Sequence, residues 1–187
     1  MTTTEWQGLN HLALVTPDMD ATVRFWHGVL GAELVGTFAA PGFRHYFFRI
    51  GKSSTVAFME YAGATVPRVE KVAGIFNAGE PQLDHISLNL ADDAALLAMQ
   101  QRLRDADCEV TEVVDHDVIH SIYFTDPGGI ALEASCWLID PTTAPVDYAG
   151  PLFADPDPVP AVRELQEIGA LAATPTTRLV PASESVR

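Results

Sequence analysis

The chain has 187 residues, of which 48% are hydrophobic, and this composition predicts a folded protein with a sizeable core. The formal net charge is −14 and lysine and arginine form no run, which argues against binding to nucleic acid or to an anionic membrane. No apolar stretch approaches the roughly 20 residues of a membrane helix, the first residues lack the pattern of a signal peptide, and the two cysteines form no disulfide framework. We therefore expect a cytoplasmic protein.

The first half of the chain has the pattern of four strands and one helix. Alternating apolar residues and turn-forming glycines predict a strand over 8–16, a helix over 19–30, and strands over 32–38, 43–50 and 54–61. Asp18 or Asp20 can cap the helix at its start, and Gly31 is suited to end it. This order is a β-α-β-β-β module.

The second half repeats this order after a linker over 62–82 that is rich in glycine and proline. The predicted elements are a strand over 83–90, a helix over 92–105, and strands over 108–114, 118–125 and 130–137. We therefore expect a domain over 1–137 that contains two modules, 8–61 and 83–137.

The remainder of the chain, residues 138–187, forms a C-terminal extension of different composition. Eight of the 13 prolines lie in it, so it is not expected to build a core of its own. Its scattered apolar residues predict an ordered strap as far as about residue 170, with a short helix over 160–170. The polar segment 174–187 is expected to be loose at its end.

Charged residues recur at matching positions in the two halves. The first begins Leu9-Asn10-His11 and the second begins Leu83-Asp84-His85, 74 residues later. The last predicted strand of each half carries a glutamate, Glu60 in the first and Glu133 in the second, 73 residues apart. Two similar halves that each place a histidine and a glutamate on strands predict one shared metal site.

The alternation of side chains along a strand separates these residues from the core. His85 shares a face with Ser87, and Glu133 shares a face with Ser135, whereas the bulky aliphatic side chains of the same strands point the other way. The aliphatic face is expected to pack on a helix. The polar face is then free to line a concave cup.

These features resemble the vicinal oxygen chelate superfamily, which includes glyoxalase I, methylmalonyl-CoA epimerase, bleomycin and fosfomycin resistance proteins and extradiol dioxygenases. The resemblance is carried by the two strand openings and by the segment Tyr123-Phe124-Thr125-Asp126-Pro127-Gly128-Gly129 before Glu133. It implies an α+β fold in which two paired βαβββ modules form a cup-shaped mixed sheet. It covers residues 8–137 and not the extension.

The family pattern implies that His11, His85 and Glu133 are the metal ligands. Two imidazoles and one carboxylate leave coordination positions open, which suits Fe(II) with a chelating substrate and dioxygen. Mn, Ni, Zn and Co are the alternative metals. The other histidines considered, His27, His45 and His120, are expected to be ordinary core or surface residues.

Glu60 distinguishes two branches of the family. In the glyoxalase and epimerase branches this region supplies a fourth protein ligand, which favours Lewis-acid chemistry with Ni, Zn, Co or Mn. The alternative is a solvated carboxylate at the end of a strand, or a partner that orients a ligand. Both interpretations remain open from the spacing alone.

The segment from Val114-Asp115-His116 to Tyr123 resembles the signature of extradiol dioxygenases. The resemblance implies that His116 moves protons near the bound oxygen and that Tyr123 hydrogen-bonds the substrate hydroxyl. The alternatives are that His116 is a loop residue and that the Asp-Pro-Gly-Gly segment is a hairpin turn. Common extradiol dioxygenases have four modules, whereas this chain has two.

The favoured hypothesis is an Fe(II) extradiol-type dioxygenase that cleaves the ring of a small catechol-like substrate. The second is a glyoxalase- or epimerase-like isomerase with Glu60 or Glu133 as the base. The third is a drug-binding resistance protein without catalysis. We expect a homodimer, and the cup could close within one chain or across the dimer.

Overall fold

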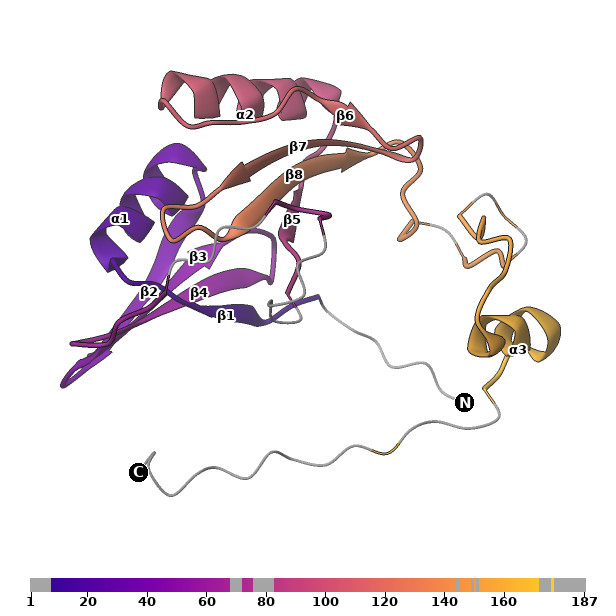
Figure 1. Ribbon diagram of the computed structural model, residues 1–187, viewed down its shortest axis with the longest axis horizontal. Coiled ribbons are helices and arrows are strands. Elements are labelled where there is room, and N and C mark those ends of the chain that lie inside the picture. The colour runs from indigo at the N-terminus through magenta and orange to yellow at the C-terminus, as the bar shows by residue number, and fades with distance from the viewer. Residues whose placement is uncertain are drawn as a thin grey trace. The chain divides into compact units, whose positions relative to one another are not determined.

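The computed structural model describes residues 8–67, 72–75, 83–143, 145–148, 150, 152–171 and 176. The chain divides into two compact units, Met1–Ile139 and Asp140–Arg187. The first unit is α+β and contains two modules, each with a four-stranded mixed sheet (Figure 1). The expected fold class is therefore confirmed.

The first module follows the predicted order. Its elements are β1 (His11–Val15), α1 (Met19–Val23), η1 (Arg24–Val29), β2 (Glu33–Ala40), β3 (Phe43–Arg49) and β4 (Thr55–Tyr61). The strand order is β1-β4-β3-β2, with β1 parallel to β4 and the other pairs antiparallel. The parallel pair brings the first and last strands of the module side by side.

The predicted helix over 19–30 is present as two consecutive pieces. The Asp18 carboxylate accepts a hydrogen bond from the backbone N–H of Ala21 at 3.0 Å, which caps the start of α1. The chain then continues as a π-helix, in which the N–H of Leu30 donates to the carbonyl of Phe25 at 2.9 Å. Gly31, with a φ of +75°, ends the helix as expected.

The second module repeats this arrangement. Its elements are β5 (Ile86–Asn89), α2 (Asp93–Asp105), β6 (Val114–Asp115), β7 (Ile119–Thr125) and β8 (Ala131–Trp137). The strand order is β5-β8-β7-β6, and β5 is parallel to β8. In Figure 1, α2 runs alongside β7 and β8, which it contacts.

The predicted strand over 108–114 is wrong in its extent, because β6 contains only Val114 and Asp115. The carbonyl of Thr111 accepts a hydrogen bond from the Gln100 side chain of α2 at 2.7 Å instead of joining a regular ladder. The Thr111 hydroxyl accepts a bond from the N–H of Tyr123 at 3.0 Å. Side-chain hydrogen bonds therefore replace part of the strand pairing at this edge.

The core lies between the helices and one face of each sheet. In the first module, Trp26 of η1 is fully buried and packs on Phe58, with ring centroids 5.3 Å apart. In the second, Leu96 and Leu103 of α2 and Leu132 of β8 are buried. These contacts explain why the aliphatic face of each sheet carries the helix.

Contacts from η1 join the two modules. The indole N–H of Trp26 donates to the Asp126 carboxylate at 3.4 Å, and Phe25 lies against Phe124 with ring centroids 6.4 Å apart. The Arg102 guanidinium of α2 donates to the carbonyl of Gly28 at 3.0 Å. The turn that contains Asp126 thus connects β7 to β8 and also contacts the first module.

The second unit contains the helix α3 (Pro160–Ile168), close to the predicted position. Gly169, at φ +68°, ends this helix. The ring of Tyr148 packs on that of Phe153, with centroids 5.1 Å apart. The Gln166 side chain of α3 donates a hydrogen bond to the carbonyl of Tyr148 at 3.2 Å. The segment 174–187 predicted to be loose lies outside the described residues, apart from Thr176.

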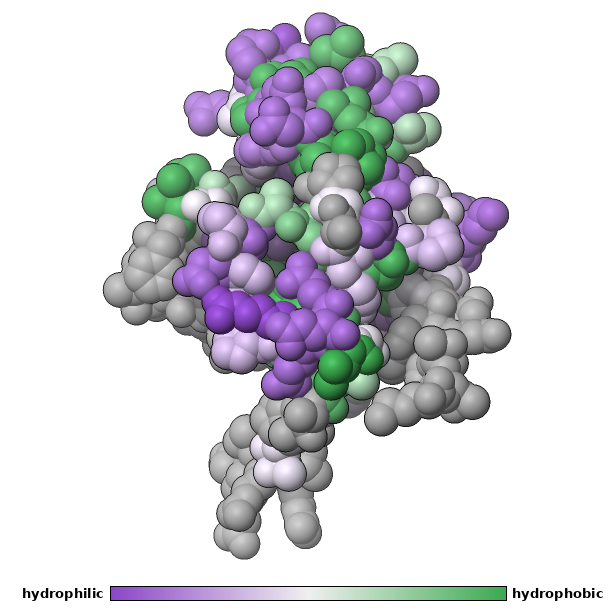
Figure 2. Space-filling model, turned by 90° about the vertical axis from the view of Figure 1, so that its right-hand side faces the viewer, coloured by the Kyte–Doolittle hydropathy of each residue, from purple (hydrophilic) through white to green (hydrophobic). Residues whose placement is uncertain are grey.

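The surface carries most of the charged side chains. On the face seen in Figure 2, hydrophilic residues are interspersed with smaller hydrophobic groups. Among the described residues, no helix combines the length and the hydropathy that a transmembrane span requires.

Candidate functional site

Strand register places the predicted polar residues of the second module on one face of its sheet. Glu133 of β8 pairs with Ser87 of β5 on one side and with Tyr123 of β7 on the other. Ser135 pairs with Ser121 in the next row on the same face. Because paired residues share a face, these side chains lie opposite α2, as the alternation predicts.

The Glu133 carboxylate is buried, with 6% of the residue exposed, and both of its oxygens are held. Its Oε2 lies 2.9 Å from Nε2 of His85, and its Oε1 accepts a hydrogen bond from the Ser121 hydroxyl. The other ring nitrogen of His85, Nδ1, lies 2.6 Å from Oδ1 of Asp84. A carboxylate at one nitrogen orients the imidazole so that the other nitrogen faces Glu133, which is typical of metal-binding histidines.

Two further predicted residues adjoin this pair. The ring of Tyr123 lies edge-on to the ring of His85, with centroids 6.2 Å apart. The Tyr123 hydroxyl is 2.8 Å from Nε2 of His116, which lies in the turn between β6 and β7. Burial raises the pKa of Tyr123, and the negative charge of Glu133 raises it further. The phenol therefore stays protonated and is able to donate a hydrogen bond.

His11 occupies the corresponding place in the first module, among aromatic side chains. Its ring lies 5.7 Å from that of Phe47 and 6.3 Å from that of His45, both of which belong to β3. Phe38 continues this row and is 63% exposed. Thus the sheet face of the first module is aromatic, whereas that of the second is polar.

His45 was expected to be an ordinary core or surface residue, but its environment is unusual. Its Nε2 is buried and has no hydrogen-bond partner in the described part of the chain. Burial lowers the pKa of His45, and nearby His11 lowers it further. A buried nitrogen without a partner, next to a predicted ligand, is available to a bound molecule. Alternation along the predicted strand 43–50 shows only that His45 and Tyr46 point to opposite faces. The register of β3, β4 and β1 is what places His45 on the face of His11.

The chain does not bring the three predicted metal ligands together. Among the described residues, one group contains at least three histidine, cysteine, aspartate or glutamate side chains whose ligand atoms all lie within 4.8 Å of one another. That group does not include His11, His85 or Glu133. His85 and Glu133 meet within the second sheet, whereas His11 lies on the first.

Glu60 lies away from these residues, at the far end of β4. His11 and Val15 are the first and last residues of β1, and Val15 pairs with Met59. Glu60 is the next residue after Met59, so it lies past the end of β1 that is distant from His11. Its Oε1 accepts a hydrogen bond from the N–H of Met19 at 2.9 Å, and its Oε2 pairs with Arg44. In β4 the register position that corresponds to Glu133 is occupied by Ala57.

The group of metal-ligating side chains that does come together consists of Asp93, His120 and Cys136. These residues can hold a metal ion. The Asp93 carboxylate raises the pKa of His120, and its own pKa is lowered by the hydrogen bond with that imidazole. Burial raises the pKa of the Cys136 thiol. This group was not predicted from the sequence, although Asp93 starts a predicted helix and the other two lie on predicted strands.

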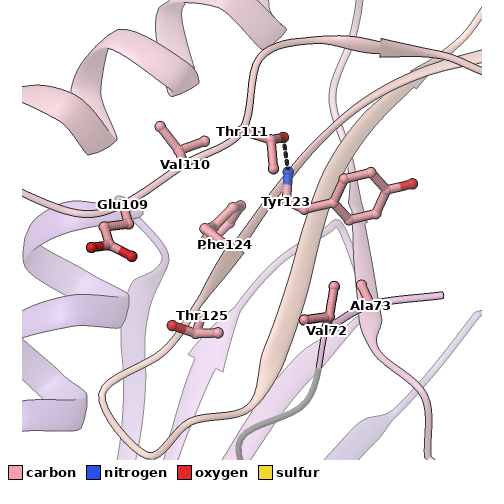
Figure 3. A pocket seen from close by; sticks show the side chains of 8 residues that line it. All are labelled: Val72, Ala73, Glu109, Val110, Thr111, Tyr123, Phe124 and Thr125. Atoms are coloured by element: carbon pink, nitrogen blue, oxygen red, sulfur yellow. Dashed lines mark hydrogen bonds between the residues drawn. The ribbon is translucent and has the colours of Figure 1, made fainter. Parts of the chain in front are cut away.

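A cavity of about 380 Å³ opens along one edge of the second sheet (Figure 3). It is lined by Val72, Ala73, Glu109, Val110, Thr111, Tyr123, Phe124 and Thr125. Figure 3 shows Tyr123 and Phe124 projecting from β7 in different directions. The cavity therefore reaches the strand that carries one predicted catalytic residue.

Comparison with solved structures supports the same fold. A domain from Frankia sp. EAN1pec described as glyoxylase/bleomycin resistance protein/dioxygenase superposes with a TM-score of 0.59 and 20% identity, over 71% of this chain and 99% of that one. A putative dioxygenase from Bacillus subtilis gives 0.54 and 22%, over 72% and 42%. Glyoxalase I from Leishmania major gives 0.51 and 16%, over 69% and 86%.

No curated protein sequence matches the chain significantly. The family model of the Glyoxalase/Bleomycin resistance protein/Dioxygenase superfamily matches residues 8–134, which include the first module, the second module as far as Ala134, and the predicted ligand positions. The chain therefore belongs to the glyoxalase/bleomycin resistance protein/dioxygenase superfamily.

Proposed function

We propose that this protein is a metal-dependent enzyme of the extradiol dioxygenase type that acts on a small catechol-like substrate. The observation that carries the proposal is the arrangement around Glu133. A histidine and a carboxylate suited to Fe(II) lie directly beside the hydrogen-bonded pair of Tyr123 and His116. Ligands and proton-transfer groups on one sheet face are what this reaction requires.

The residues fit a divalent metal by their chemistry. One imidazole nitrogen and one carboxylate oxygen face each other at 2.9 Å, and their other atoms are held by Asp84 and Ser121. With His11 as a third ligand, Fe(II) would supply a centre at which substrate and dioxygen bind together. Such a set leaves positions open for both.

The side chains around the metal position have separate tasks. Without substrate, the Tyr123 hydroxyl and Nε2 of His116 are hydrogen-bonded to each other. Substrate binding opens this bond, so that the Tyr123 hydroxyl donates to a substrate oxygen and orients it. Nε2 of His116 then accepts the proton that the substrate hydroxyl loses and returns one later in the reaction. The aromatic rings beside His11 provide an apolar surface for a planar substrate ring.

His11 would complete this site from a second copy of the chain. The sheet face that carries His11 is open, and it includes Val15, Phe38 and Tyr61 with 44%, 63% and 45% exposure. The face of His85 and Glu133 lacks a third ligand within 4.8 Å among the described residues. Pairing the aromatic face of one copy with the polar face of the other covers the exposed apolar side chains and brings His11 to the site that lacks a third ligand. We therefore propose a homodimer with shared sites.

Fe(II) loaded anaerobically into protein purified without added metal should give oxygen uptake with catechols. His85→Ala and Glu133→Ala should abolish Fe(II) binding and turnover, while Tyr123→Phe and His116→Ala should retain Fe(II) and lower kcat by about 10²–10⁴-fold. His27→Ala is the matched control, because His27 is an exposed residue of η1. Absence of oxygen uptake with the Fe(II)-loaded protein contradicts the proposal.

Mixing inactive variants tests the shared site directly. His11→Ala and His85→Ala dimers, exchanged with each other, should recover about one quarter of the wild-type sites, because a mixed dimer has one site with both defects and one with neither. No recovery after confirmed subunit exchange would place each site within one chain.

A further inference from the structure

The group formed by Asp93, His120 and Cys136 lies on the helix-covered face of the second sheet. Cys136 of β8 pairs in register with His120 of β7, and Asp93 is the first residue of α2. Glu133 is three residues before Cys136 on β8, so alternation directs the two side chains to opposite faces. The group is therefore separate from the site proposed above.

One distance in this group matches that of a metal site, and the other is the shorter distance of a hydrogen bond. Oδ1 of Asp93 lies 2.7 Å from Nδ1 of His120 and 3.3 Å from Sγ of Cys136. All three ligand atoms lie within 4.8 Å of one another. Ligand atoms around a tetrahedral zinc ion lie roughly 3.3–3.8 Å apart, as follows from bonds of about 2.0–2.3 Å. Small side-chain rotations would open the group to that size.

Asp115 supplies an independent feature of such a site. Its Oδ1 lies 3.6 Å from Nε2 of His120, the ring nitrogen that faces away from Asp93. Histidines that bind a metal through one nitrogen usually direct the other to a carboxylate, which sets the tautomer and the ring orientation. At this ion-pair distance, Asp115 would serve as a positioning residue for a metal-bound His120.

The group is also accessible from one side. Cys136 is buried, the His120 side chain is 22% exposed, and the Asp93 side chain is 57% exposed. An ion can therefore enter past Asp93 and reach the thiol at the base. A simple ion pair would need only Asp93 and His120, whereas the added sulfur ligand favours a thiophilic cation.

We propose that Asp93 Oδ1, His120 Nδ1 and Cys136 Sγ form a second metal site, which takes a divalent cation of the zinc class. The three ligands belong to α2, β7 and β8, so the ion would fasten the helix to the sheet. A fourth coordination position is left to water. The cation replaces the thiol proton, which is released to solvent when the metal–sulfur bond forms.

Co²⁺ titration of the full-length, EDTA-treated protein tests this site. The thiolate ligand should give a sulfur-to-cobalt charge-transfer band. The proposed site of His85 and Glu133 contains no sulfur and therefore cannot produce this band. Cys136→Ser should lose the band, and Asp93→Asn and His120→Gln should weaken Co²⁺ binding at this site at least tenfold. Asp115→Asn should weaken it by about 10–100-fold.

Two control variants test whether the sulfur ligand is Cys136. Cys108→Ser removes the other cysteine and should keep the band, and His85→Ala should keep it whatever happens to the proposed dioxygenase activity. Circular dichroism checks that each variant is folded; His120→Gln, which keeps the thiol, provides the test if Cys136→Ser does not fold. No band in the wild-type protein at saturating Co²⁺, or an unchanged band in folded Cys136→Ser, would overturn the site.

Discussion

His85 and Glu133 meet across two adjacent parallel strands, with Nε2 of the imidazole 2.9 Å from Oε2 of the carboxylate. The Ser121 hydroxyl holds the other oxygen of that carboxylate. Parallel pairing of β5 with β8 produces this contact, because it places Ser87 beside Glu133 and so brings His85 within reach. The contact joins residues 48 positions apart in the chain.

Ser121→Ala should weaken metal binding at the proposed site of His85 and Glu133 by about 10–100-fold without removing a ligand. The reason is that the Glu133 carboxylate loses the hydrogen bond that orients it. Isothermal titration with the metal measures the change. Ser87→Ala is the matched control on the same face, since Ser87 bonds to Ser135 at 2.8 Å. Equal effects of the two substitutions would contradict the orienting role.

Glu60→Gln should retain the metal and much of the oxygenase activity. The amide oxygen can still accept the hydrogen bond from Met19, and only the charge that faces Arg44 is lost. Metal content after gel filtration and the rate of oxygen uptake are the measurements. Loss of both tight metal binding and turnover would instead identify Glu60 as a fourth ligand and favour the isomerase hypothesis.

The Asp126 carboxyl should make the stability of the fold depend on pH. Burial raises its pKa in the folded protein above the ordinary value of an aspartate. The folded state therefore binds this proton more tightly than the unfolded state does. The resulting stabilisation is present at low pH and is lost as the pH rises through the folded-state pKa.

Urea unfolding of the wild type and of Asp126→Asn, measured from about pH 4 to about pH 7, checks this effect. The free energy of unfolding of the wild type minus that of the variant should fall as the pH rises, because only the wild type loses the stabilisation from this proton. At the acidic end the variant also lacks the oxygen that accepts the hydrogen bond from Trp26, a loss of about 1–3 kcal/mol. Asp107→Asn, at an exposed position, is the control. A pH-independent difference for Asp126→Asn would refute the prediction.

Truncation tests the expected role of the C-terminal extension as a strap. Removal of everything after Asp140 should lower the melting temperature or the oligomeric state if the extension is a strap, because each apolar side chain that a strap buries would contribute about 1.5–3 kcal/mol before the cost of ordering. Truncation after Thr174 should have little effect. Differential scanning calorimetry and sedimentation measure the two outcomes. An unchanged protein after the cut at Asp140 would show that the extension is only an appendage.

Local patterns in the sequence were sufficient for the module architecture. Periods of two and 3.6 residues, with glycines such as Gly31 at the ends, predicted the order β-α-β-β-β in both halves, and the structure confirms it. The same alternation placed Glu133 opposite the helix-covered face. These features depend on neighbours in the chain, so the sequence contains them directly.

The edges of the elements were less predictable because side chains from other elements decide them. The bond from Gln100 to the carbonyl of Thr111 interrupts the predicted strand before β6. The contacts of Glu60 with Met19 and Arg44 likewise depend on how β4 meets the start of α1. A propensity pattern does not contain either contact.

The sequence by itself determined which residues are polar, which face of a strand they occupy, and that the two halves share one order of elements. The tertiary structure decided which of them meet: His85 reaches Glu133 within one sheet, His11 lies on the other, and Asp93 joins His120 and Cys136. Alternation is a local property of the extended backbone. Distances between sheets and helices depend instead on long-range packing, in which the contacts of Trp26 and Asp126 set how the two modules lie.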